Sequence, residues 1–406
     1  MPSRISPAGF KPLNDTTLFK NLQLGSTKLE HRLVMAPLTR MRGVKESEGV
    51  WAPGDLAVEY YSQRASKGGL LLTEACPISR QACGYPGVPG LFTPGQSAGW
   101  KRITDAVHSK GGFIYCQLWH VGRATVPSLL GGEPCVSSSN IPLEGNALDG
   151  SVYATTPPKE LSVEEIAELV KEFAAAGKRA LEAGFDGVEI HGANGYLLDQ
   201  FLHDNVNIRT DAYGGSIEKR VRFPLEVMKA VTDAVGAERT GIRLSPYNYF
   251  QDTRDSNPNA NWAYLCQKIA ELPKENRLSY VHMVEPRFDE VLSEEAKIAS
   301  LTTTTKSAAE AQSLLPFRQI LQKGDVKFLA AGAFNRDNAA PKLDSGDADA
   351  VVMGRWFIAN PDLPARLSDG LPLNPYDRNS FYGADPPQKG YVDYPFYEAK
   401  PIQAAA

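Results

Sequence analysis

The sequence has 406 residues, of which 42% are hydrophobic and 22% are charged. This composition is typical of a soluble globular protein with room for one large domain or two modest ones. The formal charge of −4 at pH 7 gives no basic surface, which argues against nucleic acid or an anionic membrane as a main partner.

Eight short apolar runs recur along the chain, with helical patterns between them. This alternation predicts an α/β fold with a parallel sheet, and eight is the number of strands that closes a (β/α)8 TIM barrel. A doubly wound open sheet is the alternative. The predicted strands are Arg32–Ala36, Leu70–Thr73, Phe113–Leu118, Val188–Ile190, Gly241–Leu244, Tyr280–Val284, Lys327–Ala331 and Ala350–Met353.

Two helices have clear start signals. Ser162, with Glu165 three residues later, forms a capping box before a run with apolar residues on one face, and Gly184 ends that run. Asn360 followed by Pro361 predicts the start of the last helix, because an amide cap and a proline at the first position are favoured there.

In a (β/α)8 barrel the active residues lie at the carboxyl ends of the strands. Polar groups do follow the predicted strands at that end, among them Thr39, Glu74, Gln117, Trp119, His191, Asn194, Arg243, Glu285, Arg287 and Arg355. A barrel needs roughly 250 residues, so part of this chain must be insertion or extension. We expect one domain over residues 1–406, in which residues 120–159, rich in Gly, Ser and Pro, form a cap over the barrel mouth.

The stretch from Gly187 to Tyr196, GVEIHGANGY, brings three hydrogen-bonding side chains together just after a buried strand. His191, Asn194 and Tyr196 could bind a polarised carbonyl group and supply a proton. The alternative is a core histidine with satisfied hydrogen bonds and an aromatic residue that only packs.

The last two predicted strands suggest a phosphate site. Ala331, Gly332 and Ala333 lead into a helix that we expect Asn335 to cap, and Gly354 and Arg355 follow the eighth strand. Glycines permit close backbone approach, amides at a helix start favour an anion, and arginine adds a fixed cation. Barrels commonly bind phosphate at these two loops.

The cysteine and histidine patterns indicate no metal site. The five cysteines have scattered spacings without a CxxC pair, which favours reduced thiols in the cytoplasm. His31, His108, His120, His203 and His282 lack partners at metal-ligand spacing. No apolar run has the length needed to cross a bilayer.

A set of motifs in order along nearly the whole chain resembles the old yellow enzyme family of flavin-dependent ene-reductases, and its fungal and yeast branch in particular. Asn194 stands where many plant and bacterial relatives carry a second histidine. The motifs are MAPLTR (35–40), CQLW (116–119), HGANGYLLDQF (191–201), NIRTDAYGGS (207–216), IRLSP (242–246), VEPR (284–287), GRWFIANPDL (354–363) and DRNSFY (377–382).

The resemblance implies a barrel with non-covalent FMN at its mouth, reduced by NADPH and reoxidised by an α,β-unsaturated carbonyl compound. Thr39 would bond the flavin C4 carbonyl oxygen, and Gln117 and Arg243 would face the pyrimidine edge of the ring. The cofactor-binding positions that the resemblance implies are Ala36, Pro37, Leu38, Thr39, Gln117, Arg243, Gly332, Ala333, Gly354 and Arg355.

For the reaction, the resemblance implies that His191 and Asn194 hold the substrate carbonyl oxygen and that Tyr196 protonates the α-carbon. A phenol with an ordinary pKa of about 10 is fully protonated at neutral pH, which suits that role. Trp119 and Tyr382 match pocket-lining aromatics, although either could be a packing residue.

Several functional alternatives remain open. A reductase or isomerase dedicated to one fungal natural product would share every motif. A metal-dependent barrel hydrolase or lyase that uses His191, or a binding protein without turnover, belongs to a different class. The chain could act as a monomer or a homodimer.

Overall fold

The structure is a computed structural model, and it describes residues 10–287 and 312–398. Eight parallel strands close into a barrel, because each pairs with the next and the last pairs with the first. The open-sheet alternative is therefore wrong. In order, the barrel strands are β3 (Leu33–Met35), β6 (Leu70–Pro77), β7 (Phe113–Trp119), β10 (Gly187–Gly192), β11 (Thr240–Leu244), β12 (Tyr280–Val284), β13 (Lys327–Ala331) and β14 (Ala350–Met353).

All eight predicted strands are confirmed, and the last three match at both ends. β6 is the main difference, because it continues four residues beyond Thr73. Its pairing with β7 shifts register after Leu72 and resumes at Ala75, so the strand runs past Glu74, which is itself buried. A charged residue inside an apolar strand hid this extension from the sequence pattern.

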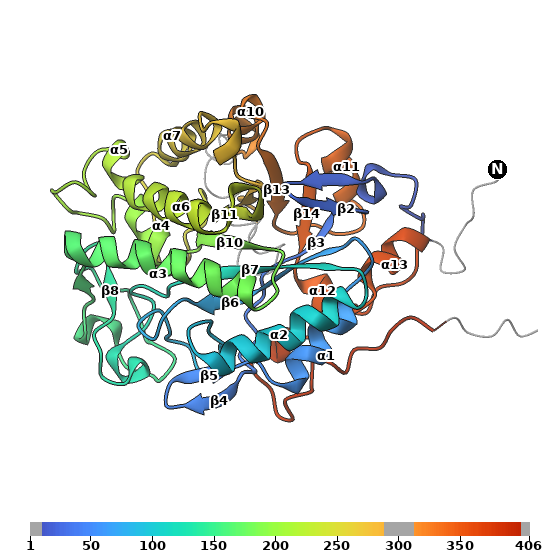
Figure 1. Ribbon diagram of the computed structural model, residues 1–406, viewed down its shortest axis with the longest axis horizontal. Helices are drawn as coiled ribbons and strands as arrows, with labels where there is room; N and C mark the ends of the chain where they lie inside the picture. Colours follow the sequence, from blue (N-terminus) through green and yellow to red (C-terminus); the bar gives the residue numbers. More distant parts are fainter. Residues whose placement is uncertain (1–9, 288–311, 399–406) are drawn as a thin grey trace, which may run out of the picture.

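Helices surround the strands (Figure 1). They are α1 (Asp55–Arg64), α2 (Pro94–His108), α3 (Val163–Glu182), α4 (Leu197–Leu202), α5 (Ile217–Arg220), α6 (Arg222–Val235), α7 (Pro258–Ala270), α10 (Leu315–Lys323), α11 (Ala339–Asp344), α12 (Arg355–Ala359) and α13 (Leu363–Asp369). Short 3-10 helices are η1 (Thr17–Phe19), η2 (Pro127–Leu130), η3 (Tyr153–Thr155), η4 (Ala237–Arg239), η5 (Phe250–Asp252), η6 (Lys274–Asn276) and η7 (Arg378–Ser380).

Three small two-stranded sheets lie outside the barrel. They are β1 (Leu22–Leu24) with β2 (Thr27–Leu29), β4 (Val44–Ser47) with β5 (Val50–Ala52), and β8 (Val136–Ser137) with β9 (Lys159–Glu160). The β1–β2 hairpin packs its leucines against inward-facing side chains of the barrel, such as Leu70 and Tyr280. Within residues 10–287 and 312–398, every helix falls short of the length or apolar content needed to cross a bilayer.

The capping box of α3 is confirmed, since the Glu165 N–H donates to Ser162 Oγ over 3.2 Å and the Ser162 N–H to Glu165 Oε2 over 2.9 Å. The other two cap predictions are wrong by two or three residues. Asn360 ends α12, and α13 begins at Leu363 after Asp362. Asn335 lies in a turn, where its Oδ1 accepts the Asp337 N–H, and α11 begins only at Ala339.

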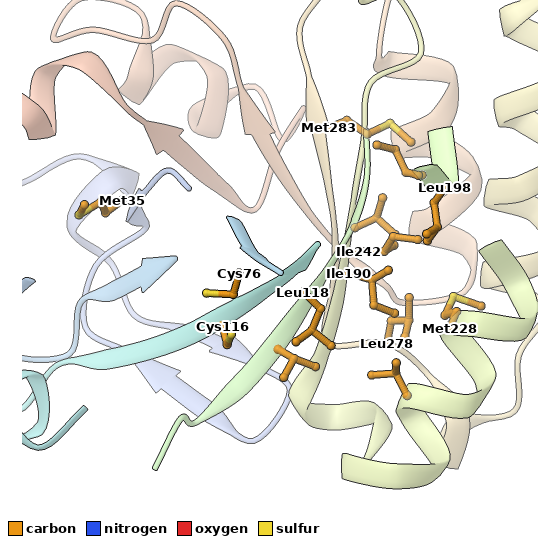
Figure 2. Close-up of a cluster of buried hydrophobic side chains, with 14 of the residues drawn as sticks. Met35, Cys76, Cys116, Leu118, Ile190, Leu198, Met228, Ile242, Leu278 and Met283 are labelled. Atoms are coloured by element: carbon orange, nitrogen blue, oxygen red, sulfur yellow. The ribbon is translucent and has the colours of Figure 1, made fainter. Parts of the chain in front are cut away.

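Strand residues alternate between two sides, and this alternation separates the core from the site. Ile190, Ile242 and Met283 belong to the core between strands and helices and cluster with Met228 (Figure 2). The residues next to them in sequence therefore point into the barrel. Those residues are Glu189, His191, Arg243 and His282.

Candidate active site

A cavity of about 450 Å³ opens at the carboxyl ends of the strands. Residues in or just after all eight barrel strands line it: Ala36, Ala75, Gln117, His191, Arg243, Val284, Ala331 and Met353. The structure brings every predicted site residue except Trp119 into this lining, namely Ala36, Pro37, Leu38, Thr39, Gln117, His191, Asn194, Tyr196, Arg243, Gly332, Ala333, Gly354, Arg355 and Tyr382.

A polar floor of Gln117, Glu189, Arg243 and His282 lies inside the barrel. Strand register puts these side chains together, because Gln117 is opposite Glu189, and Arg243 is opposite both His191 and His282. Gln117 Nε2 donates to Glu189 Oε1 over 2.7 Å, and His282 Nδ1 lies 2.9 Å from Glu189 Oε2. The Glu189 and His282 side chains have no exposed surface.

Electrostatics define the protonation states of the floor. Burial acts to raise the pKa of Glu189, but His282, Arg243 and the Gln117 hydrogen bond outweigh it and lower that pKa. Burial lowers the pKa of His282, so its imidazole is neutral, and its Nδ1–H donates a hydrogen bond to the Glu189 carboxylate. Because Gln117 Nε2 donates to Glu189, the Gln117 amide oxygen is left for the cavity. The floor therefore presents a guanidinium and an amide acceptor.

His191 carries a neutral imidazole. Burial lowers its pKa well below the ordinary value, and the positive charge of Arg243 adds to that shift. Its Nδ1 is buried without a hydrogen-bond partner among the described residues. A buried polar atom without a partner is costly, so a ligand that bonds this ring would relieve that cost.

The turn after β10 sets the positions of Asn194 and Tyr196. Asn194 has φ +58°, in the left-handed region, and its N–H donates to Ser245 Oγ over 2.7 Å. Gly195 follows with φ +76°, and a Cβ there would lie 2.7 Å from the Phe250 carbonyl oxygen, so only glycine fits. Tyr196 then occupies the N-cap position of α4. Its ring lies nearly perpendicular to the His191 ring, with the ring centres 5.1 Å apart.

At the other end of the cavity, the loops after β13 and β14 fit a phosphate group. Gly332 and Ala333 both have left-handed φ values, +114° and +52°, and such turns can expose consecutive N–H groups. A Cβ on Gly354 would lie 3.0 Å from Leu38 Cδ2, so glycine keeps this space open. Arg355 adds a cation to the same lining. Strain at a non-glycine residue such as Ala333 is common at binding sites.

The rim residues Glu285 and Arg287 play supporting parts. Glu285 pairs with Lys342 over 3.0 Å, and Arg287 Nε donates to the Gly332 carbonyl oxygen over 3.0 Å. Arg287 therefore stabilises the turn at Gly332 and Ala333 that fits a phosphate group.

Trp119 does not line the cavity. Its side chain is buried, and its ring packs perpendicular to that of Tyr196 with the ring centres 5.0 Å apart. Of its two predicted roles, packing is the one that the structure supports. Tyr382 does reach the cavity and is 61% exposed at its edge. The segment around 120–159 contributes Leu148 to the lining.

Arg40 ties the C-terminal segment to the barrel mouth. Its guanidinium donates to the carbonyl oxygens of Phe381 (3.0 Å), Ser380 (3.3 Å) and Gly390 (2.6 Å). It also lies 5.1 Å from the centre of the Tyr391 ring. These contacts hold an aromatic wall of the cavity in place, which consists of Tyr376, Phe381 and Tyr382.

Sequence reasoning missed Glu189, His282 and the Arg40 contacts. Glu189 and His282 could have been found from strand alternation, because each is an inward-facing position flanked by apolar outward ones. Within the described ranges, no group of three or more His, Cys, Asp or Glu side chains is arranged to hold a metal ion.

Comparisons with known proteins agree with this geometry. The family model of the NADH:flavin oxidoreductase / NADH oxidase family matches residues 17–374. The flavin oxidoreductase hxnT of Emericella nidulans is 63% identical over 379 residues, which cover 93% of this chain and 97% of that protein. 12-Oxophytodienoate reductase 2 of Arabidopsis thaliana is 42% identical over 382 residues, covering 93% and 95%.

Among solved structures, a morphinone reductase superposes with a TM-score of 0.81 at 40% identity, covering 94% of this chain and 97% of its own. A second structure is morphinone reductase in complex with tetrahydroNAD, with a TM-score of 0.80 at 41% identity, covering 95% and 98%.

Proposed function

The chain belongs to the NADH:flavin oxidoreductase / NADH oxidase family, as an FMN-dependent oxidoreductase of the old yellow enzyme type, and from that membership we propose that it reduces α,β-unsaturated carbonyl compounds with a nicotinamide coenzyme. The resemblance of its sequence motifs is the ground for proposing NADPH as that coenzyme. Bound FMN would supply the redox chemistry by taking hydride from NADPH and giving it to the β-carbon of the alkene. The observation that carries the proposal is one cavity lined by His191, Asn194 and Tyr196 together with Arg243 and Arg355.

The residues fit a flavin mononucleotide. Gln117 offers an amide oxygen and Arg243 a permanent cation for the polar edge of the ring, where a reduced flavin gathers negative charge. Thr39, with the backbone from Ala36 to Leu38, borders the same space. Gly332, Ala333, Gly354 and Arg355 would hold the phosphate.

His191 and Asn194 are the donors for the substrate carbonyl oxygen. Two hydrogen bonds to that oxygen draw electron density from the conjugated double bond, which makes the β-carbon more electrophilic. A neutral imidazole is suited to this task, because it donates a hydrogen bond without introducing a buried charge.

Tyr196 is the proton donor to the α-carbon. Its ring is held by Trp119 and His191, with ring centres 5.0 and 5.1 Å away, so the phenol has a defined position at the cavity wall. A positioned acid of this kind contributes roughly 10²–10⁴-fold to a rate.

Relatives support a carbonyl-bearing substrate. Two of them are reductases named for 12-oxophytodienoate and for morphinone, both oxo compounds by name. The tetrahydroNAD complex of morphinone reductase supports a nicotinamide coenzyme as the reductant.

An anaerobic substrate panel tests the proposal. Purified enzyme with NADPH, or with NADH in parallel, would be supplied with cyclohexenone, a nitroalkene and a maleimide, and the products identified by mass. We expect saturated products and faster turnover with NADPH. Coenzyme oxidation without any saturated product would contradict the proposed reaction, and equal or faster rates with NADH would contradict the coenzyme preference.

A further inference from the structure

Three residues of one loop hold Asn194. The loop follows β11 and contributes Ser245, Asn248 and Gln251. Ser245 Oγ accepts the Asn194 N–H over 2.7 Å, Gln251 Nε2 donates to the Asn194 carbonyl oxygen over 3.0 Å, and Asn248 Nδ2 donates to Asn194 Oδ1 over 3.0 Å. The backbone and one amide atom of Asn194 are therefore committed to this loop.

The polarity of this arrangement is set by a backbone group. The Phe250 N–H can only donate, and it bonds Asn248 Oδ1 over 3.0 Å. Asn248 must then turn its NH₂ group toward Asn194, and an NH₂ group of an amide is a donor only. The atom of Asn194 that faces it is therefore the oxygen.

From this chain of hydrogen bonds we infer that Asn248 is a positioning residue that fixes the Asn194 amide with its NH₂ group toward the cavity. The inference rests on the proposed function, in which Asn194 donates to a carbonyl oxygen. An asparagine amide can be rotated by half a turn with little change in shape, and the rotated form would present an oxygen to the substrate oxygen. Asn248 selects the form that binds.

Burial makes this selection effective. Asn248 is 5% exposed and Asn194 is 8% exposed, so solvent has little access to replace the bond between them. A buried donor or acceptor that loses its partner is costly, which disfavours the rotated amide. With the neutral His191, the site becomes a pair of donors and selects ligands that offer an acceptor oxygen.

Asn248→Asp tests the inference with almost no change of size. One carboxylate oxygen still accepts the Phe250 N–H, and the other now faces Asn194 as an acceptor. The Asn194 amide must turn to donate to it, and its own oxygen then faces the cavity. Asn248→Ala removes the donor without adding a charge, so both amide orientations become populated.

The measurement uses the FMN-loaded protein. Binding of the unreactive ketone cyclohexanone is titrated by the change in flavin absorbance, and enzyme reduced with dithionite is then reoxidised by cyclohexenone or by oxygen. We expect ketone affinity and the ratio of enone to oxygen reoxidation rates to fall tenfold or more in Asn248→Asp, and less in Asn248→Ala. Affinities and rate ratios within twofold of wild type in both variants would overturn the inference.

Two controls separate positioning from other effects. Asn140 is exposed and lies outside both the cavity lining and the loop that holds Asn194, so Asn140→Asp adds the same charge without touching that loop. It should leave ketone affinity unchanged. In an Asn194→Ala background, Asn248→Asp should have no further effect, and an undiminished loss there would overturn the inference.

The experiment also distinguishes the two proposals. If the reduced wild-type enzyme reacts with oxygen but not with cyclohexenone, the proposed function fails. If wild type reacts with cyclohexenone and the Asn248 variants react equally well, only the role of Asn248 fails.

Discussion

Removing the phenol of Tyr196 should slow alkene reduction while leaving the rest of the catalytic cycle nearly intact. Tyr196→Phe keeps the ring that packs against Trp119 and His191, with ring centres 5.0 and 5.1 Å away, so the cavity wall is preserved. The proton donor is lost, together with its hydrogen bond to the Tyr85 phenol. Loss of a general acid costs on the order of 10²–10⁴-fold in rate, or about 3–5 kcal/mol of transition-state stabilisation.

Stopped-flow absorbance separates the two half-reactions. Reduction of the flavin by NADPH and its reoxidation by oxygen or a quinone should proceed at near wild-type rates in Tyr196→Phe. Reoxidation by cyclohexenone should slow by at least a hundredfold.

Tyr85→Phe is the matched control. Its ring lies on the same wall with its centre 6.3 Å from that of Tyr196, and burial, with a hydrogen bond to the Tyr196 phenol, raises the pKa of the Tyr85 phenol well above the ordinary value. Tyr85 therefore stays protonated and donates to Tyr196 without serving as the acid itself, so we expect loss of its hydroxyl to cost less than tenfold. Equal enone reduction by wild type and Tyr196→Phe would refute the role of the Tyr196 hydroxyl.

Three further predictions concern buried charges. Glu189→Ala should lower stability by about 2–6 kcal/mol in urea unfolding and weaken FMN retention, because two buried donors lose their acceptor, and Glu189→Gln should cost less. Arg40→Met should cost about 2–4 kcal/mol in the same assay and raise the KM for bulky enones, because three carbonyls of the C-terminal segment that carries the aromatic wall lose a charged donor. Burial raises the pKa of the Glu74 carboxyl from 4.5 to about 7. Because the folded protein binds this proton more tightly than the unfolded chain, the free energy of unfolding of wild type should fall as pH rises through that range. Glu74→Gln has no such proton, so it should gain up to about 3 kcal/mol relative to wild type over the same range.

Each of these has an outcome that would contradict it. Full stability of Glu189→Ala would mean that the floor hydrogen bonds contribute nothing. Arg102→Met, which removes only an exposed ion pair with Asp55, is the control for Arg40→Met. Equal losses of stability in the two variants would show that Arg40 does not hold the aromatic wall in place. A stability difference between Glu74→Gln and wild type that does not change with pH would exclude the raised pKa.

The barrel was predictable because its strands are buried on both faces and read as short apolar runs. Tyr280–Val284 and Ala350–Met353 needed no other signal. β6 was cut short in the prediction because Glu74 interrupts its apolar pattern, although the strand continues through it. Cap signals were less reliable, since Asn360 bonds the end of one helix instead of the start of the next.

The candidate site was predictable where its residues stand at strand ends, as His191 and Arg243 do. Strand alternation predicts that Glu189 and His282 face inward, but their pairing needs the strand register, which one sequence does not contain. The Arg40 contact with Phe381 joins residues 341 positions apart, so no local pattern reveals it. Asn248 was overlooked because its role is to orient another side chain and it follows no known motif.

The most direct test of the account is the absorption spectrum of the purified protein, taken before and after anaerobic addition of NADPH. We expect about one FMN per chain, released on denaturation as free FMN, with a visible band that NADPH bleaches and cyclohexenone restores. Protein that carries no flavin and does not take up added FMN would contradict it.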